Sequence, residues 1–145
     1  MKLIMMTKRI GQVFLGIMGL AFIKVGIQAM LDPQSVLQQV GITLDNPSAL
    51  SSMRAVYGGM HLAFGGLCFW SAATRLEPAL RLVVLYTAGF VAGRLCSVIM
   101  DGVPNSFVLT WLGTEAFSLA ASLVLLRLLK QPHRHPLPPQ VNPIR

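Results

Sequence analysis

Four long apolar stretches run through this sequence, and they constrain its fold more than any other feature. They cover about residues 10–31, 52–73, 79–100 and 107–129. Each approaches or exceeds the roughly 20 residues that a helix needs to cross a bilayer. Only 12% of the residues are charged, whereas an ordinary soluble domain carries about a quarter charged residues. The sequence therefore predicts an all-α integral membrane protein, a four-helix bundle of four spans.

The basic residues alternate along the chain in step with these stretches. Lys and Arg precede the first span, flank the turn between the second and third, and follow the fourth, whereas residues 32–51 and 101–106 contain none. The positive-inside rule predicts this distribution for four spans with both termini in the cytoplasm. The net charge of +7 then reflects topology and contact with anionic headgroups. We expect membrane lipids as partners and no nucleic acid, because aromatic and basic residues are not interleaved.

The segments outside the spans give further boundaries. Asp32 followed by Pro33 is typical of a helix N-cap with proline at the first helical position, and apolar residues then recur at helical spacing as far as Gly41. We expect a short interfacial helix there, after the first span. Residues 1–130 are expected to form one transmembrane domain. Residues 131–145 contain five prolines and no apolar periodicity, which predicts a disordered, Pro-rich cytoplasmic tail.

Ionisable side chains recur at one depth within the predicted spans. With a rise of about 1.5 Å per residue, four of them lie roughly 10–13 Å below the outer end of their span: Lys24, His61, Arg94 and Glu115. A charge within a span costs about 2.5–3.5 kcal/mol, so these groups need partners. We expect Arg94 to pair with Glu115 from the neighbouring span, which leaves Asp101 to Arg54 or to the turn.

Helical spacing places these groups on stripes with other polar residues. If each stripe faces the bundle axis, the spans enclose a polar pocket in the outer half of the bilayer. We expect this pocket to bind an amphipathic or lipidic small molecule, such as a quinone, a prenyl lipid or a sterol-like compound. An excess of cations favours a ligand with an anionic or carbonyl oxygen. The predicted ligand-binding residues are Lys24, Arg54, Tyr57, His61, Arg94, Asp101 and Glu115.

Two other functions fit the same residues, so the sequence leaves open whether the protein is an enzyme. A membrane-embedded isomerase or cyclase would use Glu115 or Asp101 as the acid and His61 or Tyr57 as its partner, in proton transfer on a lipidic substrate. A structural accessory subunit of a membrane complex would use the charges only to specify which helices are neighbours. No spacing of His and carboxylate residues is typical of a metal site, and we expect no cofactor.

Small residues recur every four positions in three of the spans. In lipid, such stripes let helix backbones approach closely. We expect them to pack within one bundle, with a homodimer seam as the alternative. The stripes are Ala55, Gly59 and Ala63; Gly89, Gly93 and Ser97; and Ala116 and Ala120.

Three segments, RAVYGGMHLAFGGL, AGRLCSVIMDGVPN and WLGTEAFSLAASLVLL, resemble a known family. They are similar to bacterial four-helix membrane proteins of the DoxX-like group, and more closely to a branch described only as a domain of unknown function. The resemblance covers about residues 8–130. It implies a multi-pass protein of the bacterial inner (cytoplasmic) membrane with relatives among accessory components of redox systems, and it carries over no catalytic residue. The residues that match the pattern are Arg54, Gly58, Gly59, Arg94, Asp101, Gly102 and Glu115.

Overall fold

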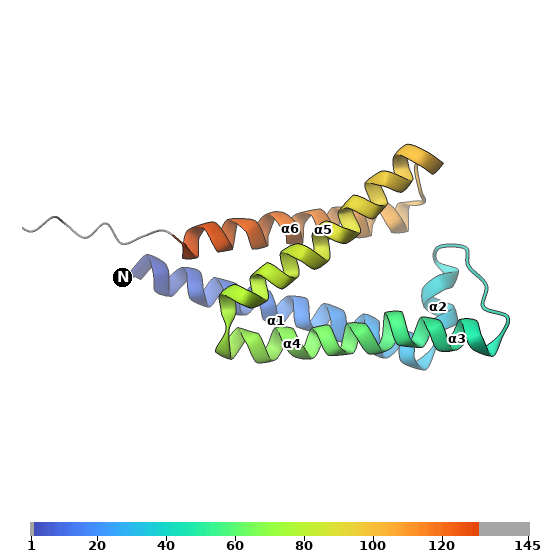
Figure 1. The fold of residues 1–145 in the computed structure, drawn as a ribbon, viewed down its shortest axis with the longest axis horizontal. Helices are drawn as coiled ribbons and strands as arrows, with labels where there is room; N and C mark the ends of the chain where they lie inside the picture. The colour runs from blue at the N-terminus through green and yellow to red at the C-terminus, as the bar shows by residue number, and fades with distance from the viewer. Residues whose placement is uncertain (1, 131–145) are drawn as a thin grey trace, which may run out of the picture.

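The computed structural model describes residues 2–130, which contain helices and no strand (Figure 1). The tail predicted to be disordered, residues 131–145, lies outside the described residues. In chain order the elements are α1 (Lys2–Leu31), α2 (Pro33–Gln38), α3 (Pro47–Met53), the π-helix η1 (Arg54–Gly59), α4 (Met60–Thr74), α5 (Leu76–Asp101) and α6 (Ser106–Leu129).

Three of these helices, α1, α5 and α6, are long and apolar enough to cross a membrane. The chain is therefore a multi-pass membrane protein with an all-helical fold. The remaining apolar stretch, residues 52–73, differs from the regular helix that we predicted. It lies in α3, η1 and α4, which follow one another directly from Pro47 to Thr74, and a π-helical turn interrupts the α-helical hydrogen bonding between them.

Two N-caps define the link between α1 and α3. The Asp32 side chain accepts a hydrogen bond from the backbone N–H of Ser35, with proline at the start of α2. Asn46 does the same for Ala49 at the start of α3, again followed by proline. Each cap satisfies a backbone donor that a helix start leaves unpaired. The short helix predicted after the first apolar stretch is thus confirmed as α2.

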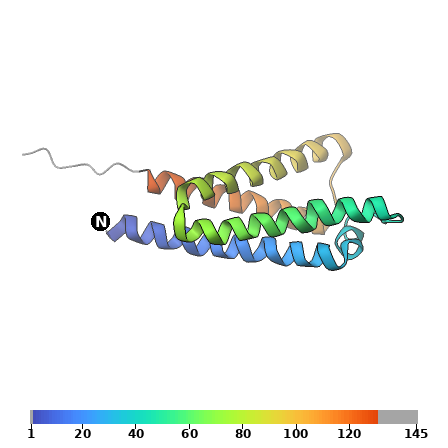
Figure 2. The same ribbon diagram turned by 60° about the horizontal axis from the view of Figure 1, so that its bottom comes forward.

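The long helices associate in two pairs. α1 packs along α4, and α5 packs along α6, with fewer contacts between the pairs (Figures 1 and 2). The pairs meet in a core near the start of α5, where all four helices contribute apolar residues: Leu15, Phe22, Cys68, Ala79, Leu80, Val83 and Leu125. Toward the other end, α5 leans away from α4 (Figure 1). We call this the open end; it carries α2 and the α5–α6 turn.

Glycine contacts bring α1 and α4 together. A Cβ atom added at Gly65 would lie 2.9 Å from the carbonyl oxygen of Gly19 and 2.7 Å from Cγ1 of Ile23. The two backbones can therefore approach this closely only because position 65 has no side chain. The stripes of small residues predicted as seams do not pack in this way. All eight of their residues are exposed: Ala55, Gly59, Ala63, Gly89, Gly93, Ser97, Ala116 and Ala120.

Asn105 joins the two helix pairs at the open end. Its side-chain oxygen accepts a hydrogen bond from the N–H of Val108, 3.0 Å away, and caps α6. Its side-chain nitrogen donates to the carbonyl oxygen of Gln39, also at 3.0 Å. One side chain thus both starts α6 and fastens the α5–α6 turn to the link between α2 and α3.

Substitutions at this residue are expected to separate the two roles. Asn105→Ala removes both the cap and the bridge, and each costs about 1 kcal/mol. Asn105→Asp keeps an oxygen for the cap and removes only the donor to Gln39, so it should lose about half as much. Denaturant titration in detergent micelles measures both variants. Equal losses would show that the cap contributes nothing, and no loss from Asn105→Asp would show that the bridge to Gln39 contributes nothing.

Candidate functional site

The predicted ion pair between Arg94 and Glu115 forms between α5 and α6. Nε of Arg94 lies 2.6 Å from Oε2 of Glu115, and Nη2 lies 3.0 Å from Oε1. The two side chains are only 25% and 12% exposed. This two-bond geometry fixes the plane of the guanidinium as well as its position. Cζ of Arg94 lies over the ring of Phe90, one turn earlier on α5, at 5.9 Å from the ring centroid.

Both ring nitrogens of His61 take part in hydrogen bonds. Nδ1 lies 3.2 Å from the carbonyl oxygen of Val56, and Nε2 lies 3.2 Å from the hydroxyl of Tyr86 on α5. A carbonyl oxygen can only accept, so Nδ1 carries the proton. In the neutral imidazole Nε2 is then the acceptor, and Tyr86 donates its hydroxyl proton to it. The histidine therefore connects α4 to α5 through a directed hydrogen bond.

The π-helical turn positions the groups on this part of the chain. Within η1 the N–H of Met60 bonds to the carbonyl of Ala55, five residues back. The wider turn leaves Tyr57 stacked on His61, with ring centroids 5.7 Å apart and planes 20° apart. Single π-turns in otherwise α-helical segments often occur at functional sites. Here the turn sets the orientation of two side chains that the sequence had placed on one stripe.

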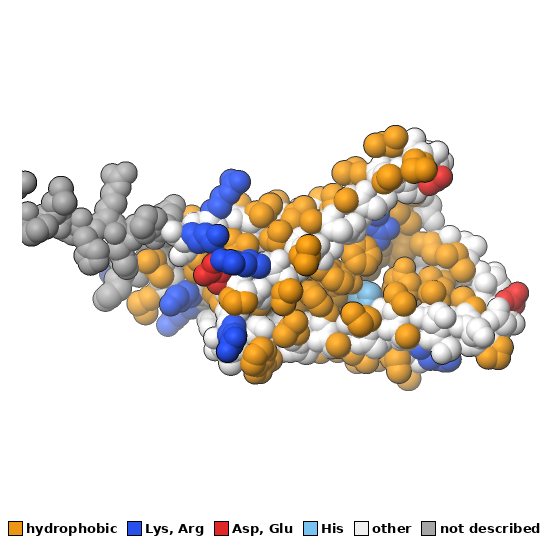
Figure 3. Space-filling view, viewed as in Figure 1, with side chains coloured by type: hydrophobic (Ala, Val, Ile, Leu, Met, Phe, Trp, Pro, Cys, Tyr) orange, Lys and Arg blue, Asp and Glu red, His pale blue; other side chains and the backbone are white. Residues whose placement is uncertain are grey.

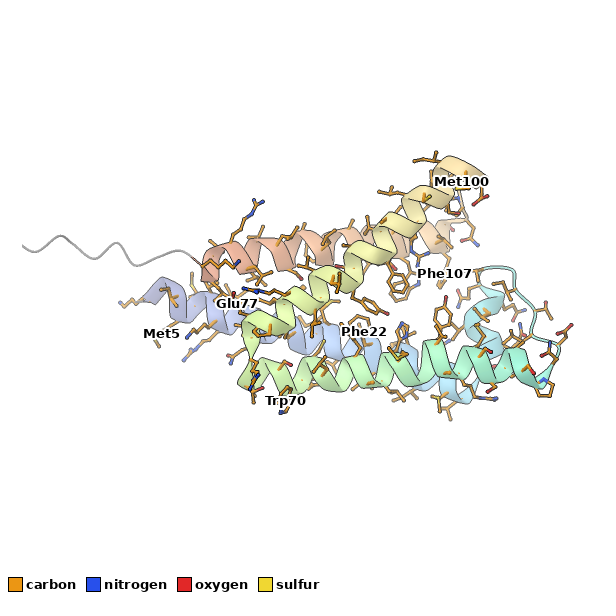
Figure 4. The ribbon with its side chains drawn as sticks, viewed as in Figure 1. Met5, Phe22, Trp70, Glu77, Met100 and Phe107 are labelled. Carbon is orange, nitrogen blue, oxygen red and sulfur yellow. The ribbon has the colours of Figure 1, made fainter. Side chains whose placement is uncertain are left out.

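Aromatic rings from α1, η1, α4 and α5 form one cluster with His61. Phe22 of α1 belongs to this cluster (Figure 4), and its ring centroid lies 5.0 Å from those of both Phe64 and Tyr86. Tyr86 also contacts Phe90, at 4.8 Å. We call this set the aromatic cluster: Phe22, Tyr57, His61, Phe64, Tyr86 and Phe90. It fills the base of the space where the two helix pairs separate.

A cleft of about 420 Å³ lies beside the aromatic cluster. It is lined by Tyr57, Tyr86, Gly89, Phe90, Gly93 and Arg94. Figure 3 shows the recess between the diverging helix pairs, with basic and histidine side chains visible inside it. A Cβ atom added at Gly89 or Gly93 would meet no atom within 4 Å. The two glycines therefore leave this face of α5 flat and open.

The seven predicted ligand-binding residues differ in their position relative to the cleft. Tyr57 and Arg94 line it. His61 and Glu115 do not line it and bond to residues that do. The other three, Lys24, Arg54 and Asp101, do not line the cleft, so the polar stripes that carry them do not all face it.

Lys24 lies on the outward face of α1. It is exposed, and it has no hydrogen-bond or ion-pair partner among residues 2–130. The buried face of α1 runs through Phe22 and Ala29, and two residues of helix rotate Lys24 about 200° away from Phe22. Equal predicted depth in the membrane does not imply a shared direction around the helices, and Lys24 does not line the cleft.

Arg54 and Asp101 form hydrogen bonds with other residues and not with each other. Nε of Arg54 donates to the carbonyl oxygen of Met30 at 3.1 Å. That carbonyl lies in the last turn of α1, where the helix itself supplies no donor. Asp101 is exposed at the end of α5 and accepts a hydrogen bond from the hydroxyl of Ser97 at 2.9 Å. Neither residue lines the cleft.

Sequence reasoning missed four of the six lining residues: Tyr86, Gly89, Phe90 and Gly93. A signal for them was present. Tyr86, Phe90 and Arg94 recur every four residues, so one helical face of α5 carries two aromatic rings that lead to the arginine. The glycines at 89 and 93 follow the same spacing and were interpreted as a packing seam.

Comparisons with known proteins give one result. Residues 10–126 match the model of a protein family described as a domain of unknown function, DUF4345. No curated protein and no solved structure gives a significant match to the chain. What the cleft can do must therefore be argued from its own residues.

Proposed function

We propose that this chain, which belongs to the DUF4345 family, binds an amphipathic or lipidic small molecule in the cleft between its two helix pairs. A quinone, a prenyl lipid or a sterol-like compound has the required character. The observation that carries the proposal is the cleft itself, in which aromatic rings lie beside a half-buried Arg94. Its volume of about 420 Å³ falls within the range of about 300–1,000 Å³ found for small-molecule sites.

The cleft offers polar contacts that the protein itself does not use. Arg94 bonds to Glu115 through Nε and Nη2, and Nη1 has no acceptor among the described residues. The hydroxyl of Tyr57 likewise has no hydrogen-bond partner there, although its ring lines the cleft. A bound molecule with oxygen acceptors would satisfy these donors, while its apolar part lies against the rings.

The proposal includes a membrane topology. Residues 47–74 form a fourth crossing, and both termini lie on the cytoplasmic side of a bacterial inner membrane, as in DoxX-like proteins. Most Lys and Arg side chains visible in Figure 3 gather where α1 begins and α6 ends, which supports this orientation. The other end carries acidic residues: Asp32 and Asp45 lie between helices, and Asp101 is the last residue of α5. The cleft then opens in the outer half of the bilayer.

The contacts favour binding over proton transfer by the predicted residues. Both oxygens of Glu115 accept from Arg94, and Asp101 bonds to Ser97. Among the described residues no hydrogen bond joins a carboxylate to His61 or Tyr57. The acid–base pairs expected of an isomerase or cyclase are therefore not assembled.

Filling the cleft is expected to abolish ligand retention without unfolding the protein. Gly93→Leu adds a side chain to open space, where no protein atom lies within 4 Å of the new Cβ. Native mass spectrometry of wild type extracted in its own lipid should show a discrete bound small molecule, and this variant should lose it. Gly66→Leu is the matched control, since Gly66 is exposed, equally unobstructed and outside the cleft.

The control variant should retain the molecule. Equal retention by Gly93→Leu and Gly66→Leu would place any bound molecule outside the cleft. A bare protein mass for wild type would favour the accessory-subunit role, in which Arg94 and Glu115 only hold α5 against α6.

A further inference from the structure

We infer that Glu115 sets the charge selectivity of this cleft, so that it accepts a planar, uncharged carbonyl compound and discriminates against anionic lipids. The inference rests on the proposed function and narrows its ligand class. Glu115 does not line the cleft. It acts through Arg94, and it is therefore a specificity residue that need not touch the ligand.

The charge balance around the cleft carries the inference. Arg94 is the one ionised group among the six lining residues, and Glu115 neutralises it through two hydrogen bonds of 2.6 and 3.0 Å. The other two cations predicted for the pocket are absent from it. Lys24 lies on the outward face of α1, and Arg54 bonds to the last turn of that helix. The excess positive charge that would attract an anion is thus missing.

An anionic headgroup and a neutral one would meet this site differently. A carboxylate or phosphate placed at Nη1 of Arg94 would compete with Glu115 for a single positive charge and would be repelled by it. An unpaired charge of this kind is costly in an apolar environment. A ketone oxygen accepts a hydrogen bond from Nη1 and brings no charge to be compensated. The pair therefore acts as a neutral donor.

The walls favour a flat headgroup. The aromatic residues Tyr57, Tyr86 and Phe90 line the cleft. Gly89 and Gly93 leave free space beside them for the ligand. A conjugated ring can stack against the aromatic side chains in offset or edge-on geometry. Its carbonyl oxygen then points to Arg94, and the hydroxyl of Tyr57 supplies a second donor.

Two probes that share a ring and a tail test this inference. They are para-nonylacetophenone, a neutral ketone, and para-nonylbenzoate, used at about pH 8 where a carboxylic acid is ionised. Each is added to the protein in phosphatidylcholine nanodiscs, and native mass spectrometry measures the ratio of bound ketone to bound carboxylate. We expect Glu115→Gln to lower this ratio by about tenfold or more, because Arg94 then carries an unbalanced charge. Partitioning into the bilayer cancels, since both proteins sit in the same lipid.

Glu77→Gln is the matched control, because it removes the carboxylate of the exposed Arg81–Glu77 pair, and neither of those residues lines the cleft. Its ratio should equal the wild-type value. If Glu115→Gln does not fold, wild type alone still tests the inference, because its ratio of bound ketone to bound carboxylate should exceed the ratio in protein-free nanodiscs. A ratio unchanged by Glu115→Gln, lowered equally by Glu77→Gln, or no higher in wild type than in the lipid alone would overturn the inference and leave the proposed function standing. Failure of wild type to retain either probe, together with a bare mass in the lipid extract, would overturn both.

Discussion

Glu115→Ala is expected to lower the free energy of unfolding by about 3 kcal/mol. Breaking a buried ion pair leaves the remaining charge uncompensated, which costs roughly 3–5 kcal/mol, and partial exposure places this pair near the lower limit. Arg94 is 25% and Glu115 12% exposed. Removing both partners with Arg94→Ala, Glu115→Ala should cost less than the sum of the single losses, because no charge is left unpaired. Denaturant titration in detergent micelles measures Glu115→Ala, Arg94→Ala and the double variant.

A second ion pair in the same chain provides the control. Arg81 and Glu77 also approach to 2.6 Å, one turn apart on α5, but their side chains are 60% and 42% exposed. Water and salt screen such a pair, which contributes about 0.3–0.5 kcal/mol. Glu77→Ala should therefore be almost silent. A comparable loss at positions 77 and 115 would mean that burial does not determine the strength of the Arg94–Glu115 pair.

Gly65→Ala is expected to destabilise the protein by about 1–3 kcal/mol, the range for overpacking a close contact. The added methyl group would lie 2.9 Å from the carbonyl oxygen of Gly19 and 2.7 Å from a side-chain carbon of Ile23. The first neighbour is backbone, so it can yield only if α1 and α4 move apart. Thermal unfolding in detergent, followed by circular dichroism, measures the loss.

The adjacent glycine gives the matched comparison. Gly66 is exposed, and a Cβ atom there meets nothing within 4 Å. Gly66→Ala should be neutral or slightly stabilising, because alanine costs less conformational entropy than glycine in a helix. If both substitutions had the same effect, the change would come from glycine's backbone freedom and not from the contact between α1 and α4.

Features that depend on neighbouring residues in the chain were predictable. Asp32–Pro33 placed the start of α2, because an N-cap is formed by residues a few positions apart. The pairing of Arg94 with Glu115 was also predictable, since a charge within a span requires a partner and these two lie at nearly equal depth on consecutive spans. The family match over residues 10–126 confirms the predicted resemblance to a domain of unknown function.

Features that depend on direction around a helix were not predictable. Lys24 and Arg94 lie at similar depths, yet only Arg94 lines the cleft. The π-turn that stacks Tyr57 on His61 has no signature that distinguishes RAVYGG from an α-helical segment. Tyr86 became part of the site because α5 crosses α4 where its hydroxyl reaches the histidine.

The sequence by itself determined that this chain is helical and membrane-embedded, where α2 begins, and which two charges must meet. These follow from local hydrogen bonding and from the cost of exposing apolar groups to water or charged groups to lipid. Only the tertiary structure decided that α1 pairs with α4 and α5 with α6, that Gly65 is a contact while Gly93 faces open space, and that Lys24 is excluded from the cleft. Helix rotation and pairing arise from packing between segments distant in the chain, and one amphipathic pattern is compatible with several such arrangements.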